Sequence, residues 1–359
     1  MKRKRILFLN LGGSMGGVES YLEGLASMLN EHADLYCLCM LPELTSRLRA
    51  LNVRVFKLPL VPSWARIFTF AFSLVLLPVL TVWHRIDIVQ VNGLLESIFL
   101  LPVRLLGREA VYTRHGPFED DRYKWYKQPA RYYPRLLSRI CVRFATLVIC
   151  VSESVGVVVR GIVPAEKTVV IPNWVSNVPP GPRQLPQEGG PVQLLYVGRL
   201  ERYKGLFLLL EAMRTIPNIQ LTVLGDGPYR QELEKMAQGL QVSFRGFQRS
   251  PETFYDEADI FVMPSLGPEG LPMVTLEAMA QGLPCIFSDL TVHAEITENG
   301  KAAMLFSCGD VGDLAEKLKA LVERPDLREV YSRAAYHRVL ANYTPEVARE
   351  AYRVAFGIS

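Results

Sequence analysis

Residues Ala258–Asp289 read ADIFVMPSLGPEGLPMVTLEAMAQGLPCIFSD, and this stretch decides the fold that we expect. An apolar run at each end has the length and composition of a buried strand, and the segment between them has helical spacing. Pro272 suits the first helical position, and Gly282 followed by Pro284 indicates the end of the helix. A strand, a helix and a second strand in this order predict an α/β fold with a parallel sheet.

Two carboxylates within this stretch are candidate ligand-binding groups. Glu269 lies in a loop interrupted by glycine and proline, and Glu277 lies in the expected helix. A loop carboxylate and a helix carboxylate can together hold a polyhydroxylated ligand at two points. A capped surface helix with two solvated glutamates explains the same pattern, so this segment alone leaves both interpretations open.

The alternation of apolar runs and helix-period segments extends over the whole chain. Proline and glycine interrupt it at residues 174–192, which we interpret as a linker between two domains. We therefore predict α/β domains at residues 1–173 and 193–345, and a C-terminal helix at 346–359 that packs back on the first domain. Further expected strands are residues 5–11, 35–40, 53–58, 86–91, 110–112, 147–151, 193–200, 220–228 and 242–247.

The net charge of +4 is unevenly distributed. Residues 1–175 contain 22 Lys/Arg and 13 Asp/Glu, and the remaining residues contain 18 and 23, so the two parts carry +9 and −5. The basic half could face anionic lipid, phosphate or nucleic acid. No zinc-finger spacing favours nucleic acid. The six cysteines show no CxxC or disulfide-like spacing, which suits a reducing cytosol.

Two segments of the basic half indicate contact with a membrane surface. Ile67–Trp83 carries no charge but is at the lower length limit of a membrane span, so we expect a buried or interface-lying helix. Residues 122–143 mix Arg and Lys with Tyr and Trp, which suits a membrane surface or a phosphate-bearing acceptor, although a solvated helix face has the same pattern. The apolar run after MKRKR is too short for a signal peptide. We expect a cytoplasmic protein in peripheral contact with the anionic inner face of the plasma membrane.

A glycine-rich loop follows the first expected strand. Gly12-Gly13-Ser14-Met15-Gly16-Gly17 separates that strand from a helix-period segment, an arrangement that lets backbone approach a phosphate or a sugar. It is neither GxGxxG nor a Walker loop, and a tight turn without a ligand is the alternative. His115 follows another expected strand, where ligands collect in open α/β sheets, but an ordinary loop histidine fits as well.

Two cations stand at the start of the second domain. Arg199 ends the expected strand, and Lys204 follows five positions later. The planar guanidinium and the mobile ammonium together suit a diphosphate. Two exposed cations beside a turn are the alternative.

These motifs occur in a fixed order, and together they resemble glycosyltransferase family 4. The resemblance covers nearly the whole chain and is carried by the glycine loop, VGRLERYKG, LGDGP and PSLGPEGLPMVTLEAMAQGLP. CVSES and VVIPNWV also look like family landmarks. The resemblance implies a retaining glycosyltransferase with the GT-B architecture, in which two Rossmann-like α/β domains have parallel sheets facing across a cleft.

The resemblance implies that the second domain holds a nucleotide-sugar donor. Arg199 and Lys204 would neutralise the diphosphate, Glu277 would hydrogen-bond the ribose, and Phe247 would lie near the base. Backbone N–H groups after Gly270 would complete the phosphate site. The implied donor-binding residues are Gly16, Gly17, Arg199, Lys204, Phe247, Gly270, Leu271, Pro272, Met273 and Glu277.

The implied catalytic residues are Glu269 and His115. Glu269 would meet the donor-sugar hydroxyls, and His115 would contact the sugar or assist the reaction. Many family members have a paired-glycine turn where this chain has Leu290–Glu295, so contacts there are open. His293 within it could replace a backbone contact, but we expect an exposed histidine.

The expected reaction is transfer of a hexose from a UDP- or GDP-sugar to a glycan or a polyprenyl- or other lipid-linked saccharide, in cell-surface polysaccharide or glycolipid synthesis. No DxD pair stands at a strand end, so we expect neither a metal nor another cofactor. A sugar-nucleotide epimerase, a phosphorylase and a non-catalytic nucleotide-sugar-binding subunit are the alternatives.

Overall fold

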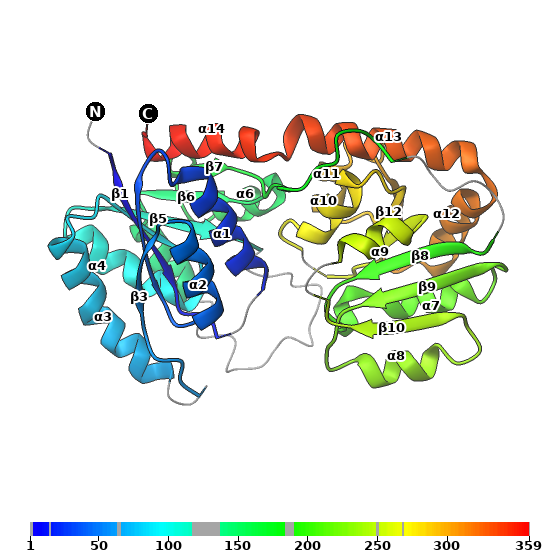
Figure 1. Ribbon diagram of the computed structural model, residues 1–359, viewed down its shortest axis with the longest axis horizontal. Coiled ribbons are helices and arrows are strands. Elements are labelled where there is room, and N and C mark those ends of the chain that lie inside the picture. Colours follow the sequence, from blue (N-terminus) through cyan, green and yellow to red (C-terminus); the bar gives the residue numbers. More distant parts are fainter. Residues whose placement is uncertain are drawn as a thin grey trace. The chain divides into compact units, whose positions relative to one another are not determined.

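The computed structural model describes residues 3–13, 16–62, 66–116, 137–183, 190–248, 251–267 and 269–358. Most of the basic and aromatic segment 122–143 lies outside these residues. The chain divides into two compact units: unit 1 is Met1–Asn173 with Pro345–Ser359, and unit 2 is Trp174–Thr344. Each unit contains one sheet accompanied by helices (Figure 1).

Unit 1 has a seven-stranded sheet in the order β3-β2-β1-β4-β5-β6-β7, and every pairing is parallel. The strands are β1 Arg5–Asn10, β2 Asp34–Cys39, β3 Arg54–Lys57, β4 Ile88–Val91, β5 Glu109–Arg114, β6 Leu147–Cys150 and β7 Thr168–Val170. The helices are α1 Gly17–Leu29, α2 Pro42–Ala50, α3 Arg66–Trp83, α4 Leu100–Leu105, α6 Glu153–Arg160 and α14 Pro345–Phe356, and the short 3₁₀ helices are η2 Leu95–Phe99, η4 Val142–Phe144 and η5 Ala165–Lys167.

The centre of the unit 1 sheet is buried on both faces. Ile6, Leu7 and Phe8 of β1 are fully buried, as are Ile88 and Val89 of β4. Continuous apolar runs of this kind are typical of parallel strands covered by helices on both sides. The sequence therefore reads as uninterrupted hydrophobic strands where the sheet is covered.

The C-terminal helix α14 belongs to unit 1. The buried hydroxyls of Tyr352 and Tyr21 lie 2.6 Å apart, which joins α14 to α1. Tyr21 also receives a hydrogen bond from Gln90 on β4, at 2.9 Å. Both chain ends therefore lie in the same unit (Figure 1).

Unit 2 has a six-stranded parallel sheet in the order β10-β9-β8-β11-β12-β13. The strands are β8 Val192–Val197, β9 Ile219–Leu224, β10 Val242–Gly246, β11 Ile260–Met263, β12 Cys285–Ser288 and β13 Met304–Phe306. The helices are α7 Leu206–Met213, α8 Arg230–Met236, α9 Glu252–Glu257, α10 Met273–Ala280, α11 Thr291–Ile296, α12 Val311–Glu323 and α13 Pro325–Asn342, with the 3₁₀ helix η6 Arg202–Lys204.

The stretch Ala258–Asp289 forms β11, α10 and β12, as its pattern predicts. Helix α10 begins one residue later than expected, because Pro272 has extended backbone (φ −65°, ψ 125°) and is the N-cap residue. Gly282 has φ +68°, a conformation that favours glycine and ends helices. The expected linker begins with Trp174 and Val175, which are buried in unit 2, and the Val175 N–H donates to the Tyr343 carbonyl at 2.9 Å.

Helix α3 is the segment Ile67–Trp83 with one preceding residue. Among the described helices, none combines the length and the apolar character needed to cross a membrane. The side of α3 that faces the unit contains buried Ser73, Leu77 and Thr81.

Candidate functional site

Both sheets reverse their strand order at one point, which is where open α/β sheets bind ligands. In unit 1 the reversal lies between β1 and β4, and in unit 2 it lies between β8 and β11. Connections leaving neighbouring strands at such a point diverge to opposite faces, which opens a crevice at the carboxyl ends of the strands. The candidate residues of each unit can therefore be compared with that edge of its own sheet.

In unit 2, glycines let the loops at this edge pack backbone against backbone. Gly205 has φ +71°, and a Cβ there would lie 1.8 Å from the Pro264 carbonyl oxygen. Gly225 has φ +132°, and its Cβ would lie 1.9 Å from the Gly198 carbonyl oxygen. No larger residue fits either place. The VGRLERYKG and LGDGP motifs thus hold the loops after β8, β9 and β11 together.

Lys204 and Glu269 form an ion pair at this edge. Lys204 Nζ lies 2.7 Å from Glu269 Oε1, and the two side chains are only 12% and 9% exposed. The Ser265 hydroxyl donates to the same oxygen at 2.7 Å. The loops after β8 and β11 thus combine a nearly buried cation, a carboxylate and a hydroxyl. The cation suits a phosphate, and the carboxylate suits sugar hydroxyls. The structure brings together two residues that the sequence selected separately.

The start of helix α10 follows Glu269 directly. Gly270, buried Leu271 and Pro272 lead into the helix at Met273, and the N-cap residue Pro272 makes no side-chain cap hydrogen bond. Backbone N–H groups of a first helical turn carry partial positive charge and bind anions. This helix start supplies the backbone groups that the resemblance assigns to a phosphate.

Glu277 lies inside α10 and is held by a different partner. The buried Tyr255 hydroxyl donates to Glu277 Oε2 at 2.8 Å. Burial raises the pKa of the Glu277 carboxyl, and the Tyr255 hydrogen bond opposes that rise. The two glutamates of the motif therefore occupy two distinct polar environments.

Arg199 and Phe247 are the most exposed of the selected residues in unit 2. Arg199 is 73% exposed and contacts Glu201 at 2.7 Å, so it and Lys204 pair with different carboxylates. Phe247 is 71% exposed directly after β10.

His293 departs from the expectation that it would be exposed. It is fully buried in α11, and its Nδ1 lies 2.9 Å from the Ser288 carbonyl oxygen, which can accept only if Nδ1 carries the proton. The Ser288 hydroxyl in turn donates to the Ser265 carbonyl at 2.6 Å. Burial lowers the His293 pKa, which keeps the ring neutral. Through Ser288, this histidine is therefore linked to the segment that contains Ser265.

In unit 1, His115 lies beyond the end of β5. Its Nε2 is 3.4 Å from Asn92 Oδ1, and its ring meets Tyr21 edge-on at 4.5 Å between centroids. Burial, with a smaller contribution from Arg114, lowers the His115 pKa to about 3. The ring is therefore neutral at pH 7 and can exchange hydrogen bonds with an uncharged ligand.

Two buried carboxylates support the glycine loop, and sequence reasoning missed both. Asn10 donates to Glu19 Oε1 at 2.8 Å, and the Leu11 N–H donates to Glu96 Oε1 at 2.7 Å. Burial is the main cause that raises the Glu96 pKa to about 7. A lone acid inside the apolar run LLESIFL was the signal that could have identified Glu96.

The glycines selected from the loop itself are at the start of α1. Gly16 is the N-cap residue, with extended backbone, and Gly17 is the first helical residue. Among the described residues, a Cβ at Gly17 would meet nothing within 4 Å.

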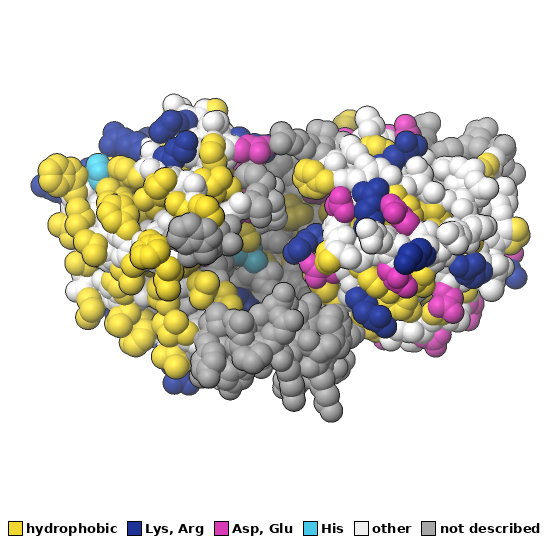
Figure 2. Space-filling view, turned by 90° about the horizontal axis from the view of Figure 1, so that it is seen from below, with side chains coloured by type: hydrophobic (Ala, Val, Ile, Leu, Met, Phe, Trp, Pro, Cys, Tyr) yellow, Lys and Arg dark blue, Asp and Glu magenta, His cyan; other side chains and the backbone are white. Residues whose placement is uncertain are grey.

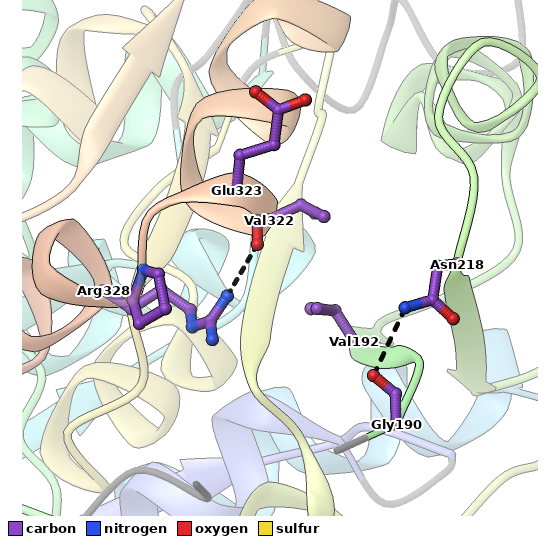
Figure 3. Close-up of a pocket in the computed structure, with 7 residues that line it drawn as sticks. Gly190, Val192, Asn218, Val322, Glu323 and Arg328 are labelled. Atoms are coloured by element: carbon purple, nitrogen blue, oxygen red, sulfur yellow. Dashed lines mark hydrogen bonds between the residues drawn. The ribbon is translucent and has the colours of Figure 1, made fainter. Parts of the chain in front are cut away.

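A hollow elsewhere in unit 2 is separate from these residues (Figure 3). It is lined in part by Val192, where β8 begins, so it lies at the opposite sheet edge from Lys204. Asn218 donates to the Gly190 carbonyl, and Arg328 donates to the Leu321 and Val322 carbonyls. The Asn218 and Arg328 side chains of this hollow are therefore engaged with the chain's own backbone.

Two family models match successive parts of the chain. Residues 15–177 match the model described as Glycosyltransferase Family 4, and residues 181–338 match Glycosyl transferases group 1. The sulfoquinovosyl transferase of Arabidopsis thaliana is 32% identical over 265 residues, which are 69% of this chain and 50% of that protein. A lipopolysaccharide core biosynthesis glycosyltransferase of Rhizobium meliloti is 29% identical over 44% of this chain and 48% of its own length. The chain thus spans about half the length of these curated relatives.

Solved structures resemble the chain over its whole length. The Anabaena protein HepE in complex with UDP-glucose has a TM-score of 0.82 at 18% identity, over 98% of this chain and 99% of that one. Sucrose-phosphate synthase from Thermosynechococcus elongatus has a TM-score of 0.80 at 20% identity, over 99% and 100%. These similarities confirm the expected α/β fold of the GT-B kind. By its sequence matches and its fold, the chain belongs to glycosyltransferase family 4.

Proposed function

We propose that this protein is a retaining glycosyltransferase that moves a hexose from a nucleotide sugar, a UDP- or GDP-sugar, to a hydroxyl of an acceptor. The observation that carries this proposal is the Lys204–Glu269–Ser265 cluster beside the start of α10. A fixed cation and helix N–H groups suit a diphosphate, and a carboxylate suits sugar hydroxyls. A related fold crystallised with UDP-glucose supports the donor class.

Each selected residue has a role in this proposal. Lys204, Arg199 and the backbone N–H groups of Gly270, Leu271 and Met273 stabilise the negative charge that develops on the leaving diphosphate. Glu277 binds the ribose, and Phe247 lies near the base. In unit 1, Gly16 and Gly17 leave room for the donor.

The proposed reaction keeps the configuration at the anomeric carbon. The bond from that carbon to the diphosphate oxygen breaks, the acceptor oxygen bonds to the same face, and the acceptor proton passes to a leaving phosphate oxygen. Glu269 orients the sugar hydroxyls. His115, neutral at pH 7, hydrogen-bonds the sugar and does not act as an imidazolium acid.

We also propose that the acceptor is a glycan or a lipid-linked saccharide presented at a membrane. Support comes from relatives named as a lipopolysaccharide core biosynthesis glycosyltransferase and a phosphatidyl-myo-inositol mannosyltransferase. The basic character of the first half of the chain agrees with an anionic membrane surface.

A panel of UDP-, GDP- and ADP-sugars, with and without a crude lipid extract, tests the reaction. Nucleotide release that requires the extract is the expected result, and it distinguishes transfer from epimerisation. Phosphate-dependent release of a sugar phosphate would indicate a phosphorylase instead. Binding of a donor without any release would indicate a non-catalytic subunit, and no binding of any donor would refute the proposal.

Calorimetric titration of the preferred donor tests the site. Lys204→Ala should weaken binding about tenfold or more, because a charge-assisted hydrogen bond contributes about 1.5–3 kcal/mol. Lys301→Ala is the matched control, since Lys301 forms an ion pair with Glu298 at 2.9 Å on the surface of the same unit. Equal donor affinity in the two variants would remove Lys204 from the site.

A further inference from the structure

In helix α3 the side that faces unit 1 is largely polar and the outward side is apolar, which is the reverse of the usual arrangement in a surface helix. Its inward stripe, at every fourth position, is Thr69, Ser73, Leu77 and Thr81, and all four side chains are buried. Its outward side is apolar throughout the described residues, from Ile67, which is 70% exposed, to Trp83, which is 79% exposed. A surface helix in water turns its apolar stripe to the core and its polar residues to the solvent. The outward side of α3 is therefore adapted to an apolar surrounding.

The buried polar groups do not explain this reversal. The Thr81 hydroxyl donates to the Leu77 carbonyl of the same helix at 2.7 Å, and the Ser73 hydroxyl has no partner among the described residues. They form no polar network that would require them to face inward. Their small size lets α3 pack closely on the unit. It does not explain why the outward residues of α3 are apolar.

The apolar surface continues beyond α3. Helix α4 contacts both α3 and η4. On α4 and residues 137–144, Leu105, Leu137 and Ile140 are exposed. Figure 2 shows hydrophobic side chains gathered over much of this face of unit 1. Contiguous exposed apolar surface of this extent marks an interaction site.

The charged residues within this surface are all arginines. Residues 67–86, 100–108 and 137–144 contain arginines and no aspartate or glutamate. Arg85, Arg104, Arg139 and Arg143 are exposed. Trp83 lies at the end of α3 two positions before Arg85. An apolar face bordered by arginine, with a tryptophan at its margin, is typical of helices that lie in the headgroup region of an anionic bilayer.

We propose that α3, with α4 and residues 137–144, is the surface by which this protein inserts into the interface of an anionic membrane. Helix α3 lies along the membrane plane, because its inward stripe stays packed on unit 1, and its 18 residues extend about 27 Å. The proposal rests on the membrane location proposed above and names the face that makes the contact. It does not depend on the transfer reaction.

Vesicle flotation of the full chain tests this surface. Wild-type protein should float with phosphatidylcholine vesicles containing phosphatidylglycerol, and less with phosphatidylcholine alone or in high salt. Phe72→Ser with Val75→Ser should reduce the bound fraction at least tenfold. Val330→Ser with Val354→Ser is the matched control, because these valines are exposed on α13 and α14, and it should float like the wild type. Equal flotation of both double variants would overturn the proposal.

A second measurement does not depend on a variant of the apolar face. Lipids brominated near the headgroup should quench the Trp83 component of the fluorescence, obtained as the difference between wild type and Trp83→Phe. Absence of quenching in vesicles that bind the protein would place the contact elsewhere. The wild type could instead fail to float and form a dimer in size-exclusion chromatography that Phe72→Ser/Val75→Ser abolishes. That result would assign the surface to a second copy of the chain and overturn the proposal. Protein that floats but releases no nucleotide would refute the transfer reaction and leave this inference standing.

Discussion

The buried carboxyl of Glu96 makes the stability of unit 1 depend on pH in a direction that the structure determines. Its Oε1 accepts from the Leu11 N–H at 2.7 Å, at the start of the glycine loop. Burial raises its pKa from 4.5 to about 7, with a further rise from the charge of Glu19 and opposing hydrogen bonds from the Leu11 and Gly93 backbone. The substitution to examine is Glu96→Gln, which keeps the shape and removes the charge.

The magnitude follows from the difference between the two pKa values. A pKa raised from 4.5 to about 7 corresponds to about 3 kcal/mol, at 1.36 kcal/mol for each tenfold change. Between these pH values the folded protein keeps the Glu96 proton and the unfolded chain releases it. The free energy of unfolding therefore falls as the pH rises from about 4.5 to about 7 and changes little from this group above that.

Urea denaturation at pH 5 and pH 8 measures this effect. Pulsed hydrogen exchange, read out on peptides from unit 1, reports the unfolding of that unit separately. The wild type should lose about 2.5 kcal/mol between the two pH values from this group, because pH 5 is already above the unfolded pKa of 4.5, and Glu96→Gln should lose that much less. Glu109→Gln is the control, because Glu109 is exposed and pairs with Lys4 at 3.1 Å. The same pH dependence in Glu96→Gln and in the wild type would refute the reasoning.

Three further predictions concern the sites of both units. Gly205→Ala should cost about 2–4 kcal/mol by urea unfolding, because its Cβ would overlap the Pro264 carbonyl at φ +71°; an unchanged midpoint would contradict this. Tyr255→Phe should raise the pKa of Glu277 further, since it removes the hydroxyl that donates to the carboxylate. The pKa can be measured by ¹³C NMR of the Glu277 carboxyl, and the same pKa in the variant and the wild type would contradict this prediction. His115 should show no titration between pH 5 and 9, because burial holds its pKa at about 3; NMR shifts of its ring that change near pH 6.5, identified with His115→Gln, would disprove it.

Most strands could be predicted from the sequence because both sheets are parallel and covered. Such strands are continuous apolar runs separated by helical segments, and β1, β4 and β11 each appear as expected. The strands that were missed, β7 and β13, have three residues each, too few to establish a pattern. Short edge strands are defined by pairing with a neighbour more than by their own composition.

The sequence selected the residues of the candidate site but could not indicate how their side chains pair. Lys204 and Glu269 are 65 positions apart, and only the fold brings Nζ within 2.7 Å of the carboxylate. Arg199 and Lys204 were expected to converge on one phosphate, yet each pairs with its own carboxylate in the structure. His293 was expected to be exposed because a histidine in a loop usually is, but α11 turns it into the core.

The orientation of α3 connects the sequence with the proposed place of the reaction. Composition identified an uncharged run, and a buried helix and an interfacial one were equally consistent with it. The stripe Thr69, Ser73, Leu77 and Thr81 recurs every four residues, so the chain already contained the two sides of the helix. Burial decides which side faces inward, and it is the polar one. Because water would favour the opposite rotation of the helix about its axis, the outward side of α3 is suited to an apolar surrounding.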